Sequence, residues 1–581
     1  MCDIVFLTPT AKINLNAECT GTLLLATILK QKGINVDIYR FYESDESKGF
    51  DSFVEETANN ILAKEPRIVS FYCRCDCFLA DIRIAQRVKT INKDITVIFG
   101  GPQADAVSDL LLDEIPEVDY CCSGEGEETI YPLVSGILSG GDVTGIDGLT
   151  YRNDEGKSVT NPRPALKQSL DELPFVDYSL VPEETIQDTV NNNKSFPVEV
   201  GRGCPFNCAF CSTCLFWKRK FRIKTSGRII EEIEEIKDLY GVSKFSFLHD
   251  LFTAKKQNVL EFCKYVKESG NNIKWMCSSR IDTLDEETID AMASSGLTGV
   301  YFGIETGSPR MQKITHKNLK IPQVIDVCKM LTDRDVRITA SFIYGFPEET
   351  EEDLEQTLQL MRKLMEMGVT SLQLHLCAIF PGTEYFEKYK EELVFADNYS
   401  DQVSDFGVKE NFEFITSHSD LFPFYYEYHN EHREKFALLS DYALKCINLY
   451  NTLLRLDSAR YEEKTLVQIY LDLMEANKEL ISGTNEVEGE ETETSLLVDN
   501  YLASVGYSEE ELRKLREIFA FINDERRIYG GKEDAMEVKN YGADIKAFYE
   551  KKGLAEISAT PTMVVFRKIG KDLSLVFRPG M

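Results

Sequence analysis

Four cysteines stand close together in the stretch "GRGCPFNCAFCSTCLFWKRKF", at positions 204, 208, 211 and 214. The spacing is C-x3-C-x2-C, followed by x2 to the fourth thiol. Structural zinc sites use four thiolates, but their second C-x2-C pair usually stands a dozen or more residues away. A bacterial ferredoxin run is C-x2-C-x2-C-x3-C-P, whereas here Pro205 follows the first cysteine. The stretch therefore predicts a metal centre whose spacing is neither that of a usual zinc site nor that of a bacterial ferredoxin.

Elements that position this stretch follow from the chain on either side of it. From Phe196 to about residue 395, β-type runs alternate with amphipathic helical runs in about six βα units. Six units are fewer than the eight of a complete barrel, so we expect a partial parallel (β/α)6 barrel of TIM-like form. Sites of such barrels lie at the carboxyl ends of the strands, and the cysteine stretch begins there.

A second region of alternating strands and helices precedes the barrel. Residues 1–139 predict an α/β domain with a doubly wound, Rossmann-like parallel sheet, whose ligands lie at the strands' carboxyl ends. Glycine-bearing turns fall there, at "GGP" (100–102) and "GEGEE" (124–128). Neither has the G-x-G-x-x-G spacing of a dinucleotide site, and the second places acidic residues where a pyrophosphate would lie. A plain nicotinamide domain is therefore disfavoured.

The rest of the chain divides by composition. Residues 140–195 are rich in Gly, Pro and Asp and predict a linker with one hairpin signal, "LTYRNDEGKSVT". Residues 396–581 predict a mostly helical C-terminal domain that closes with a β-hairpin, "TMVVFRKIGKDLSLVFRP". This last region resembles no family, and we expect much of the substrate specificity to come from it. As a hypothesis it covers the barrel mouth, and its hairpin either packs as a small sheet or pairs with a peptide strand.

The cysteine triplet, together with four later motifs in order, resembles the radical S-adenosylmethionine superfamily. The motifs are "FSFLHDLFT", "YFGIETGSPR", "FIYGFPEETEEDLEQT" and "IFPGTEY". The resemblance implies a [4Fe-4S] cluster held by Cys204, Cys208 and Cys211, with the fourth iron open to S-adenosylmethionine. Cys214 is then a nearby free thiol. The residues implied to lie near S-adenosylmethionine are Phe210, Asp250, Gly303 and Glu305, and Arg280 is a further candidate.

The N-terminal region resembles the cobalamin-binding domains fused ahead of radical enzymes, through "GTLLLATILKQKGINVDIY", "KEPRIVSFYC", "ITVIFGGPQA" and "VDYCCSGEGEET". The residues expected near cobalamin are Gly21, Ser70, Arg74, Gly100, Gly101, Pro102, Gly124, Glu125, Gly126 and Glu127. The family's D-x-H-x-x-G signature is absent, and no histidine occurs before His249. Cobalt should therefore lack a histidine ligand, leaving Arg74, water, or a cysteine of "CRCDCF" (Cys73, Cys75 or Cys77) beneath it. These cysteines could equally be strand-end residues or a metal patch.

Alternation along "LQLHLCAIF" separates three leucines from a polar set. In a barrel the leucines should meet the outer helices and leave the polar set in the lumen, where substrate binds. The lumen candidates for the chemistry are Tyr301, Gln373, His375 and Cys377. A structural histidine remains the alternative for His375.

Composition limits the location and the partners. The net charge is −31, from 96 acidic and 65 basic residues, and such a surface repels phosphate backbones, so no nucleic-acid partner is expected. The only basic patch, "WKRKFRIK" (217–224), could instead stabilise an anionic cluster or ligand. We find no apolar run long enough to span a bilayer and no signal peptide, which predicts a cytoplasmic protein without a membrane partner. Sixteen cysteines in a reducing compartment then favour metal ligation or burial over disulfides.

The leading functional hypothesis is a cobalamin-dependent radical S-adenosylmethionine methyltransferase that acts on an unactivated carbon of a small-molecule or peptide substrate. It implies three cofactors, the [4Fe-4S] cluster, S-adenosylmethionine and cobalamin, and a reducing partner such as flavodoxin or ferredoxin. The first alternative keeps the cofactors but performs a cyclisation or rearrangement. A non-catalytic corrinoid or electron-transfer protein would need Cys214 as a fourth ligand. A tRNA-modifying enzyme would need a basic tail, whereas this tail is acidic.

Overall fold

The computed structural model describes residues 2–9, 14–41, 49–369, 371–396, 400, 403–428, 431–482, 490–530, 535–569 and 572–579. The chain forms two compact units. Their boundaries differ from the domain boundaries that the composition suggested. The first comprises Met1–Glu349 and Lys363–Ala437, and the second comprises Thr350–Arg362 and Leu438–Met581. None of the described helices combines the length and the apolar composition that a bilayer crossing requires.

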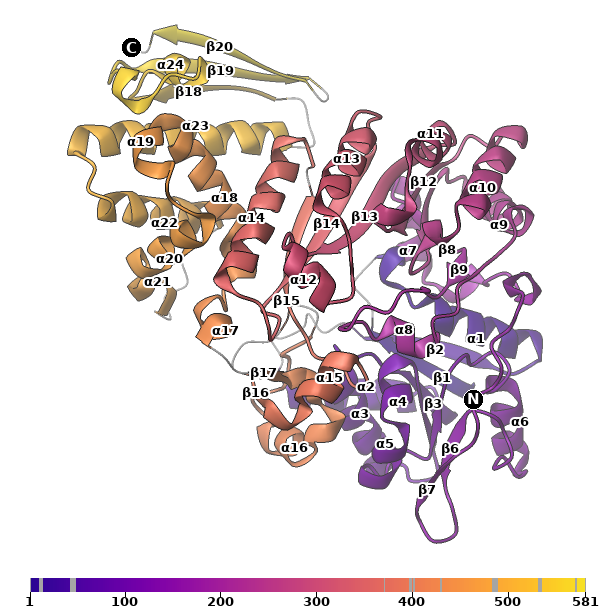
Figure 1. Ribbon diagram of the computed structural model, residues 1–581. Helices are drawn as coiled ribbons and strands as arrows, with labels where there is room; N and C mark the ends of the chain where they lie inside the picture. Colours follow the sequence, from indigo (N-terminus) through magenta and orange to yellow (C-terminus); the bar gives the residue numbers. More distant parts are fainter. Residues whose placement is uncertain are drawn as a thin grey trace. The chain divides into compact units, whose positions relative to one another are not determined.

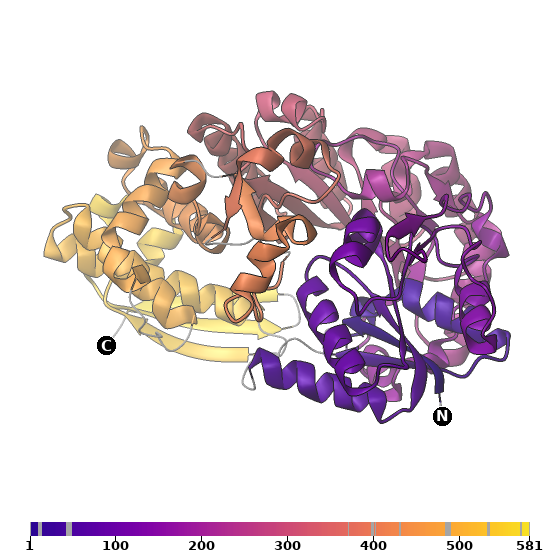
Figure 2. The same cartoon turned by 90° about the horizontal axis from the view of Figure 1, so that it is seen from below.

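The N-terminal part of the first unit is built on a seven-stranded sheet of order β2-β1-β3-β4-β5-β6-β7. Its strands are β1 (Cys2–Pro9), β2 (Val36–Phe41), β3 (Pro66–Tyr72), β4 (Thr96–Gly100), β5 (Tyr120–Cys122), β6 (Leu149–Arg152) and β7 (Ser158–Thr160). The first five run parallel. Helices α1 (Thr20–Gln31) and α6 (Ile130–Ser139) lie on one face, and α2 (Phe50–Leu62) and α3 (Phe78–Ile91) lie on the other (Figure 1; Figure 2). The expected doubly wound sheet is confirmed.

Residues 140–195 do more than link two domains. The hairpin signal in this segment forms β6 and β7, and β6 pairs antiparallel with β5, so the hairpin extends the first sheet. The side chain of Arg152 then donates to the carbonyls of Val118 and Ile115, which belong to the preceding domain. The many Gly, Pro and Asp residues indicate the tight turns of this segment. They do not indicate that the strands between the turns join a neighbouring sheet.

The barrel forms as expected from six parallel strands in the order β15-β14-β13-β12-β11-β8. They are β8 (Phe196–Glu199), β11 (Lys244–Leu248), β12 (Lys274–Ser279), β13 (Leu297–Glu305), β14 (Arg337–Tyr344) and β15 (Ser371–Leu376). The covering helices include α9 (Ser226–Tyr240), α10 (Lys256–Glu268), α11 (Glu286–Ser294) and α13 (Ile321–Thr332), which line its outer side in Figure 1. Local sequence fixes their ends: α9 begins after the N-cap Thr225 and stops at Gly241, whose φ is +69°.

Residues 403–425 pack on the N-terminal sheet domain, although the composition assigned them to the C-terminal domain. Their apolar side chains join the core that also contains α2 and α3. Phe422 and Phe78 have ring centroids 5.7 Å apart, and Phe406 packs edge-on against Phe50. Gly407 allows this approach, because a Cβ there would lie 2.2 Å from the Phe50 ring. The aromatic residues of this segment are thus explained by burial against the first domain.

The second unit is helical with a terminal sheet. Its longer helices are α18 (Leu439–Leu456), α20 (Leu466–Ala476), α22 (Glu490–Ser504) and α23 (Glu509–Gly530). The expected terminal hairpin is present as β19 (Thr562–Ile569) and β20 (Asp572–Pro579), and β18 (Ala535–Tyr541) pairs with β19 as a third antiparallel strand. Phe566 is buried, and its ring stacks on Phe521 of α23 with centroids 5.8 Å apart. One face of the sheet therefore packs as a small core of its own.

Candidate active site

The cysteine loop follows β9 (Gly201–Arg202), a short strand that pairs antiparallel with β10 (Arg222–Ile223). Cys204, Cys208 and Cys211 are half-buried free thiols on this loop. The loop is held from two sides: the Ala209 amide donates to the Thr315 carbonyl at 3.0 Å, and the Ala209 carbonyl accepts from the Tyr385 amide at 3.2 Å. The backbone is therefore fixed between the first and third thiols.

Cys214 is more deeply buried than the other three cysteines. It lies in α8 (Thr213–Phe216), is buried, and its thiol lies 3.0 Å from the Cys211 carbonyl oxygen, to which it donates. Burial raises the pKa of the Cys214 thiol, as it raises those of Cys204 and Cys208, so the pKa does not separate Cys214 from the other thiols. This arrangement supports the interpretation of Cys214 as a free thiol.

Two buried cations lie beside the cysteine loop. An Arg280 Nη1 lies 3.8 Å from the Cys208 sulfur, while its other nitrogens bind Asp282 and the Lys317 carbonyl. The Arg280 guanidinium also stacks over the Phe206 ring at 3.9 Å. Burial raises the pKa of the Cys208 thiol, and the charges of Lys317 and Arg280 oppose that rise. Positive charge at this position suits a centre held by thiolates.

Glu305 ends β13 in a backbone conformation that is rare for a side chain other than glycine, with φ +68°. Its carboxylate is buried and accepts from the Lys317 ammonium at 2.8 Å. Gly303 makes room for it, because a Cβ on Gly303 would lie 2.3 Å from the Glu305 carboxylate. The register of β13 against β14 shifts between Gly303 and Glu305, and such a bulge turns the carboxylate away from the regular strand direction.

Asp250 and Phe210 have structural contacts of their own. Asp250 Oδ2 accepts from the Gly203 amide at 2.7 Å and so holds the backbone directly before Cys204. Phe210 lies in a small apolar cluster with Ala209, Phe346 and Tyr385, and its ring is 5.9 Å from that of Phe346. Both residues therefore lie at the cysteine loop, and their role toward S-adenosylmethionine stays a prediction.

The acidic turn after β5 contacts the barrel. Glu125 accepts from the guanidinium groups of Arg202 at 2.7 Å and Arg222 at 2.8 Å, and Glu127 also pairs with Arg202 at 2.7 Å. Arg202 makes a second, bidentate pair with Glu199, at 2.9 and 3.0 Å. These side chains are nearly all buried. The carboxylates predicted to lie near cobalamin are thus occupied by the two arginines that flank the cysteine loop.

Two basic residues of the stretch after the cysteines form buried ion pairs. Arg222 pairs with Glu125, and Lys224 is buried against Glu232 at 2.7 Å. The Trp217 ring lies near the two arginines that pair with Glu125. Its centroid is 5.8 Å from the Arg202 guanidinium and 5.5 Å from that of Arg222. Ion pairing within the protein explains the charges of Arg222 and Lys224, whereas Lys218, Arg219 and Lys220 are exposed.

The carboxyl edge of the first sheet carries the other predicted cobalamin residues. Gly100, Gly101 and Pro102 end β4 and begin α4 (Pro102–Ala106). Gly101 has φ +95°, and a Cβ there would lie 2.8 Å from the Cys73 carbonyl oxygen, so only glycine fits this turn. Ser70 is buried in β3, and Gly21 lies in the first turn of α1. Gly124 has φ +80°, and Gly126 packs against Leu25 of α1.

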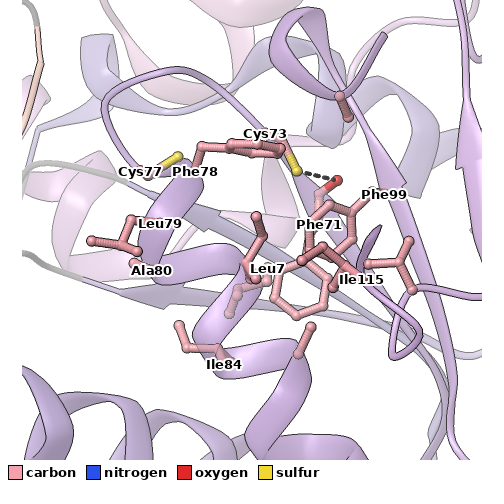
Figure 3. Packing of buried hydrophobic residues seen from close by; sticks show 14 of the residues in the cluster. Leu7, Phe71, Cys73, Cys77, Phe78, Leu79, Ala80, Ile84, Phe99 and Ile115 are labelled. Carbon is pink, nitrogen blue, oxygen red and sulfur yellow. Dashed lines mark hydrogen bonds between the residues drawn. The ribbon is translucent and has the colours of Figure 1, made fainter. Parts of the chain in front are cut away.

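Two of the cysteines suggested beneath cobalt point elsewhere. Figure 3 shows Cys73 and Cys77 within the apolar core, among Phe71, Phe78 and Phe99. Cys73 is 0% and Cys77 is 2% exposed, and burial raises the pKa of each thiol well above its usual range. Burial in the core explains the positions of both thiols without a role as cobalt ligands. Cys75 is half-buried with a pKa raised to about 12, first by burial and then by Asp76. Arg74 is 40% exposed and forms a bidentate pair with Asp76.

A cavity of about 810 Å³ occupies the barrel interior. Of the four lumen candidates, Tyr301 lines it. Gln373 is exposed and His375 is half-buried, and neither is among the cavity-lining residues. Cys377 is buried in the apolar cluster with Ala209 and Phe346 instead. The wall residues that the sequence did not single out include Glu199, Trp217, Ser246, His249, Ser278, Arg337, Thr339 and Ser371.

The donor sets match the expected cofactors in two respects. Three thiols on one pinned loop beside two cations suit a cluster with three protein ligands. No three His, Cys, Asp or Glu side chains among the described residues are arranged to hold a single metal ion, and a four-iron cluster needs its thiols farther apart. A B12-type sheet edge with positive-φ glycine turns at β4 and β5 offers backbone close to a ligand.

Comparisons with known proteins agree with this geometry. Residues 198–361 match the radical SAM superfamily, and residues 9–134 match the B12 binding domain. An uncharacterized methyltransferase of Pyrococcus horikoshii is 33% identical over 350 residues, which are 59% of this chain and 75% of that protein. The chain belongs to the cobalamin-binding radical S-adenosylmethionine enzymes. Its cofactors are the [4Fe-4S] cluster, S-adenosylmethionine and cobalamin.

More distant relatives differ in the reaction that their names state. The anaerobic magnesium-protoporphyrin IX monomethyl ester cyclase of Rubrivivax gelatinosus is 27% identical over 53% of this chain, which spans only 56% of that enzyme. Among solved structures, the cobalamin-dependent S-adenosylmethionine radical enzyme OxsB with aqua-cobalamin and S-adenosylmethionine bound is 14% identical. It has a TM-score of 0.58 and covers 90% of this chain and 81% of its own. This likeness supports the fold alone.

Proposed function

We propose that this radical S-adenosylmethionine enzyme methylates an unactivated carbon of a small molecule bound in the barrel lumen. Reductive cleavage of S-adenosylmethionine at the cluster would supply the hydrogen-abstracting radical, and methylcobalamin would supply the methyl group. Cys204, Cys208 and Cys211 would hold the cluster. Glu305, Arg280, Asp250, Phe210 and Gly303 would lie around S-adenosylmethionine.

The observation that carries the proposal is the ion-pair connection between the turn after β5 and the hairpin that bears the cysteine loop. Glu125 accepts from Arg202, and Arg202 stands two residues before Cys204. The contact fixes the carboxyl edge of a cobalamin-type sheet against the mouth of a radical S-adenosylmethionine barrel. A methyl donor at the first edge and a radical source at the second would then face the same substrate.

A peptide is the alternative class of substrate, and a flavodoxin or ferredoxin is the proposed reductant. The family needs an electron donor, whose identity stays a prediction. The expected cytoplasmic location also stays a prediction.

Similarity to a cyclase favours a second candidate, a radical cyclisation or rearrangement that uses the same cofactors without methyl transfer. Anaerobic reconstitution with iron, sulfide and cobalamin, followed by S-adenosylmethionine and reductant, separates the two. Methylation predicts both deoxyadenosine and S-adenosylhomocysteine. Deoxyadenosine alone, with cobalamin bound, would favour the second candidate, and Cys208→Ala is the control that should form neither product.

A further inference from the structure

A row of hydroxyl side chains crosses the inner face of the barrel. Ser278 of β12 pairs in register with Tyr301 of β13, Tyr301 with Thr339 of β14, and Thr339 with Ser371 of β15. All four residues line the cavity. Residues in register on parallel strands lie at the same height, so the four hydroxyls form one layer across four neighbouring strands.

Alternation along the strands explains why these hydroxyls face inward. Their chain neighbours Cys277, Val300 and Phe302, Ile338 and Ala340, and Leu372 are buried apolar residues. Successive side chains of a strand point to opposite faces, so the apolar set packs under the outer helices and the hydroxyl set faces the lumen. The strand register therefore sets the positions of all four hydroxyl-bearing residues.

Three of these hydroxyls have no hydrogen-bond partner in the described part of the protein, namely those of Ser278, Thr339 and Ser371. A nearby group shows the contrast: outside the lumen row, Thr253 lies 2.6 Å from both Ser279 and Thr283, so those hydroxyls satisfy one another. A hydroxyl that loses water without gaining a partner costs about 1–3 kcal/mol. A purely hydrocarbon substrate filling this lumen would incur that cost at several positions.

Arg337 lies in the next layer toward the amino ends of the strands. It opens β14 and lines the cavity, and its register partner on β13 is Gly299, which has no side chain to fill the space beside it. The other cavity-lining arginine, Arg202, pairs with three carboxylates. Arg337 makes no ion pair with any residue that the structure describes. Its guanidinium is thus available to an anionic ligand.

The distance between Arg337 and the strand layer that holds Glu305 limits the ligand's shape. Phe342, which pairs with Glu305, stands five residues after Arg337 on β14. At about 3.3 Å per residue the two layers are roughly 17 Å apart along the strand. Glu305 contacts Lys317 beside the cysteine loop, so Arg337 lies at the end of the barrel remote from the expected cluster.

We propose that the lumen binds an extended, oxygen-bearing substrate whose carboxylate or phosphate group pairs with Arg337. Its other oxygens accept from or donate to the row formed by Ser278, Tyr301, Thr339 and Ser371. The reacting carbon lies toward the other end, near the cysteine loop. This inference rests on the proposed function, because it takes the lumen as the substrate site. It assigns the substrate class, an oxyanion, to which a planar guanidinium binds with two parallel hydrogen bonds.

Binding of three matched probes tests the proposal on the reconstituted full-length enzyme with S-adenosylmethionine present. The probes are hexanoate, hexyl phosphate and the uncharged hexanamide, and titration calorimetry measures each affinity. We expect at least one anion to bind about tenfold or more tightly than hexanamide. The better of the two anions identifies a carboxylate or a phosphate as the group recognised.

Three variants then locate the binding. Arg337→Gln should weaken the preferred anion about tenfold and leave hexanamide unchanged, and Arg337→Lys should restore part of the loss. Arg334→Gln is the matched control, since Arg334 is not among the cavity-lining residues and already pairs with Asp290 at 2.6 Å. Equal affinities for hexanoate, hexyl phosphate and hexanamide in the wild-type enzyme, or an Arg337→Gln variant that binds as the wild type does, would overturn the inference.

Deoxyadenosine formation by the same wild-type preparation is measured separately. Absence of this product with a loaded cluster would count against the proposed function. Deoxyadenosine formation together with anion binding that does not depend on Arg337 would leave the function standing and reject only the substrate class.

Discussion

The Glu125 carboxylate lies 2.7 Å from the Arg202 guanidinium and 2.8 Å from that of Arg222, and these contacts join two domains of different ligand chemistry. Burial alone would raise the pKa of Glu125, but the hydrogen bonds and charges of Arg222 and Arg202 outweigh it and lower the pKa. The carboxylate is therefore ionised at neutral pH. A buried ion pair of this kind stabilises one arrangement of its elements, and loss of one partner leaves the other uncompensated.

Replacing Glu125 by Gln should therefore loosen the interface. The change keeps the shape of the side chain, but it removes the carboxylate that pairs with Arg222 and one of the three that pair with Arg202. Such a loss lowers the free energy of unfolding by about 3–5 kcal/mol. We expect faster amide hydrogen exchange in both residues 120–128 and 200–204, measured by mass spectrometry. Asp285→Asn, which removes the half-exposed ion pair with Lys256, is the control and should change neither segment. Unchanged exchange in Glu125→Gln would show that the contact does not hold the two elements together.

Only the first three cysteines of the motif should be needed for the cluster. Cys204→Ala should lose the iron, the sulfide and the broad absorbance near 400 nm of a reconstituted sample. Cys214→Ala should keep all three, because the Cys214 thiol is buried and directed to the Cys211 carbonyl. Loss of the cluster in Cys214→Ala would mean four protein ligands and would revive the electron-transfer interpretation.

Periodicity and motif spacing predicted the main features of the fold and of the cysteine site. The six barrel strands and the five parallel strands of the first sheet alternate with amphipathic helices along the chain, so their pattern is local. The contacts of Glu125 with Arg202 and Arg222 are not local, since the residues stand 77 and 97 positions apart. Composition likewise could not show that residues 403–425 pack on α2 and α3.

Lumen residues were harder to predict than cluster residues. Gln373 and Tyr301 both follow the alternation of their strands, yet only Tyr301 lines the cavity. Arg337, Ser278, Thr339 and Ser371 carry no motif, and only the strand register brings them to neighbouring layers. Lys317 lies twelve residues after Glu305, and its approach depends on the turn through α12 (Pro309–Ile314).

His249 should make the stability of the protein depend on pH. It is buried between the Arg222 carbonyl and the Leu251 amide, and burial lowers its pKa to about 4 from 6.5. The Leu251 amide donates to Nδ1, which places the proton of the neutral ring on Nε2, facing the carbonyl. In the unfolded chain the ring takes up a proton below about pH 6.5, whereas in the folded protein it does so only near pH 4. Stability is therefore lost as the pH falls from about 6.5 to 4.

The size of this effect at pH 5 is about 2 kcal/mol, from 1.36 kcal/mol for each pKa unit. Urea unfolding at pH 7 and pH 5 should show that the wild type loses more free energy of unfolding than His249→Gln does. In the variant the carboxylates still titrate, but this ring is absent. Equal losses in the two proteins would show that His249 is not held neutral.

Cobalt bound by this enzyme should receive no nitrogen ligand from the protein. The sequence has no histidine before His249, and within the first sheet domain Cys73 and Cys77 are directed into the apolar core. Arg74 is a half-exposed cation at that edge, and its charge makes it a poor ligand. The pairing with Asp76 raises the pKa of Arg74, against the effect of burial.

The test is the electron paramagnetic resonance spectrum of bound cobalt(II) cobalamin. Uniform ¹⁵N labelling of the protein, with unlabelled cobalamin, should leave the hyperfine structure of this spectrum unchanged. A histidine ligand from elsewhere in the chain would alter the splitting on labelling. Such a change would refute the interpretation that water or an uncoordinated side chain lies beneath the metal.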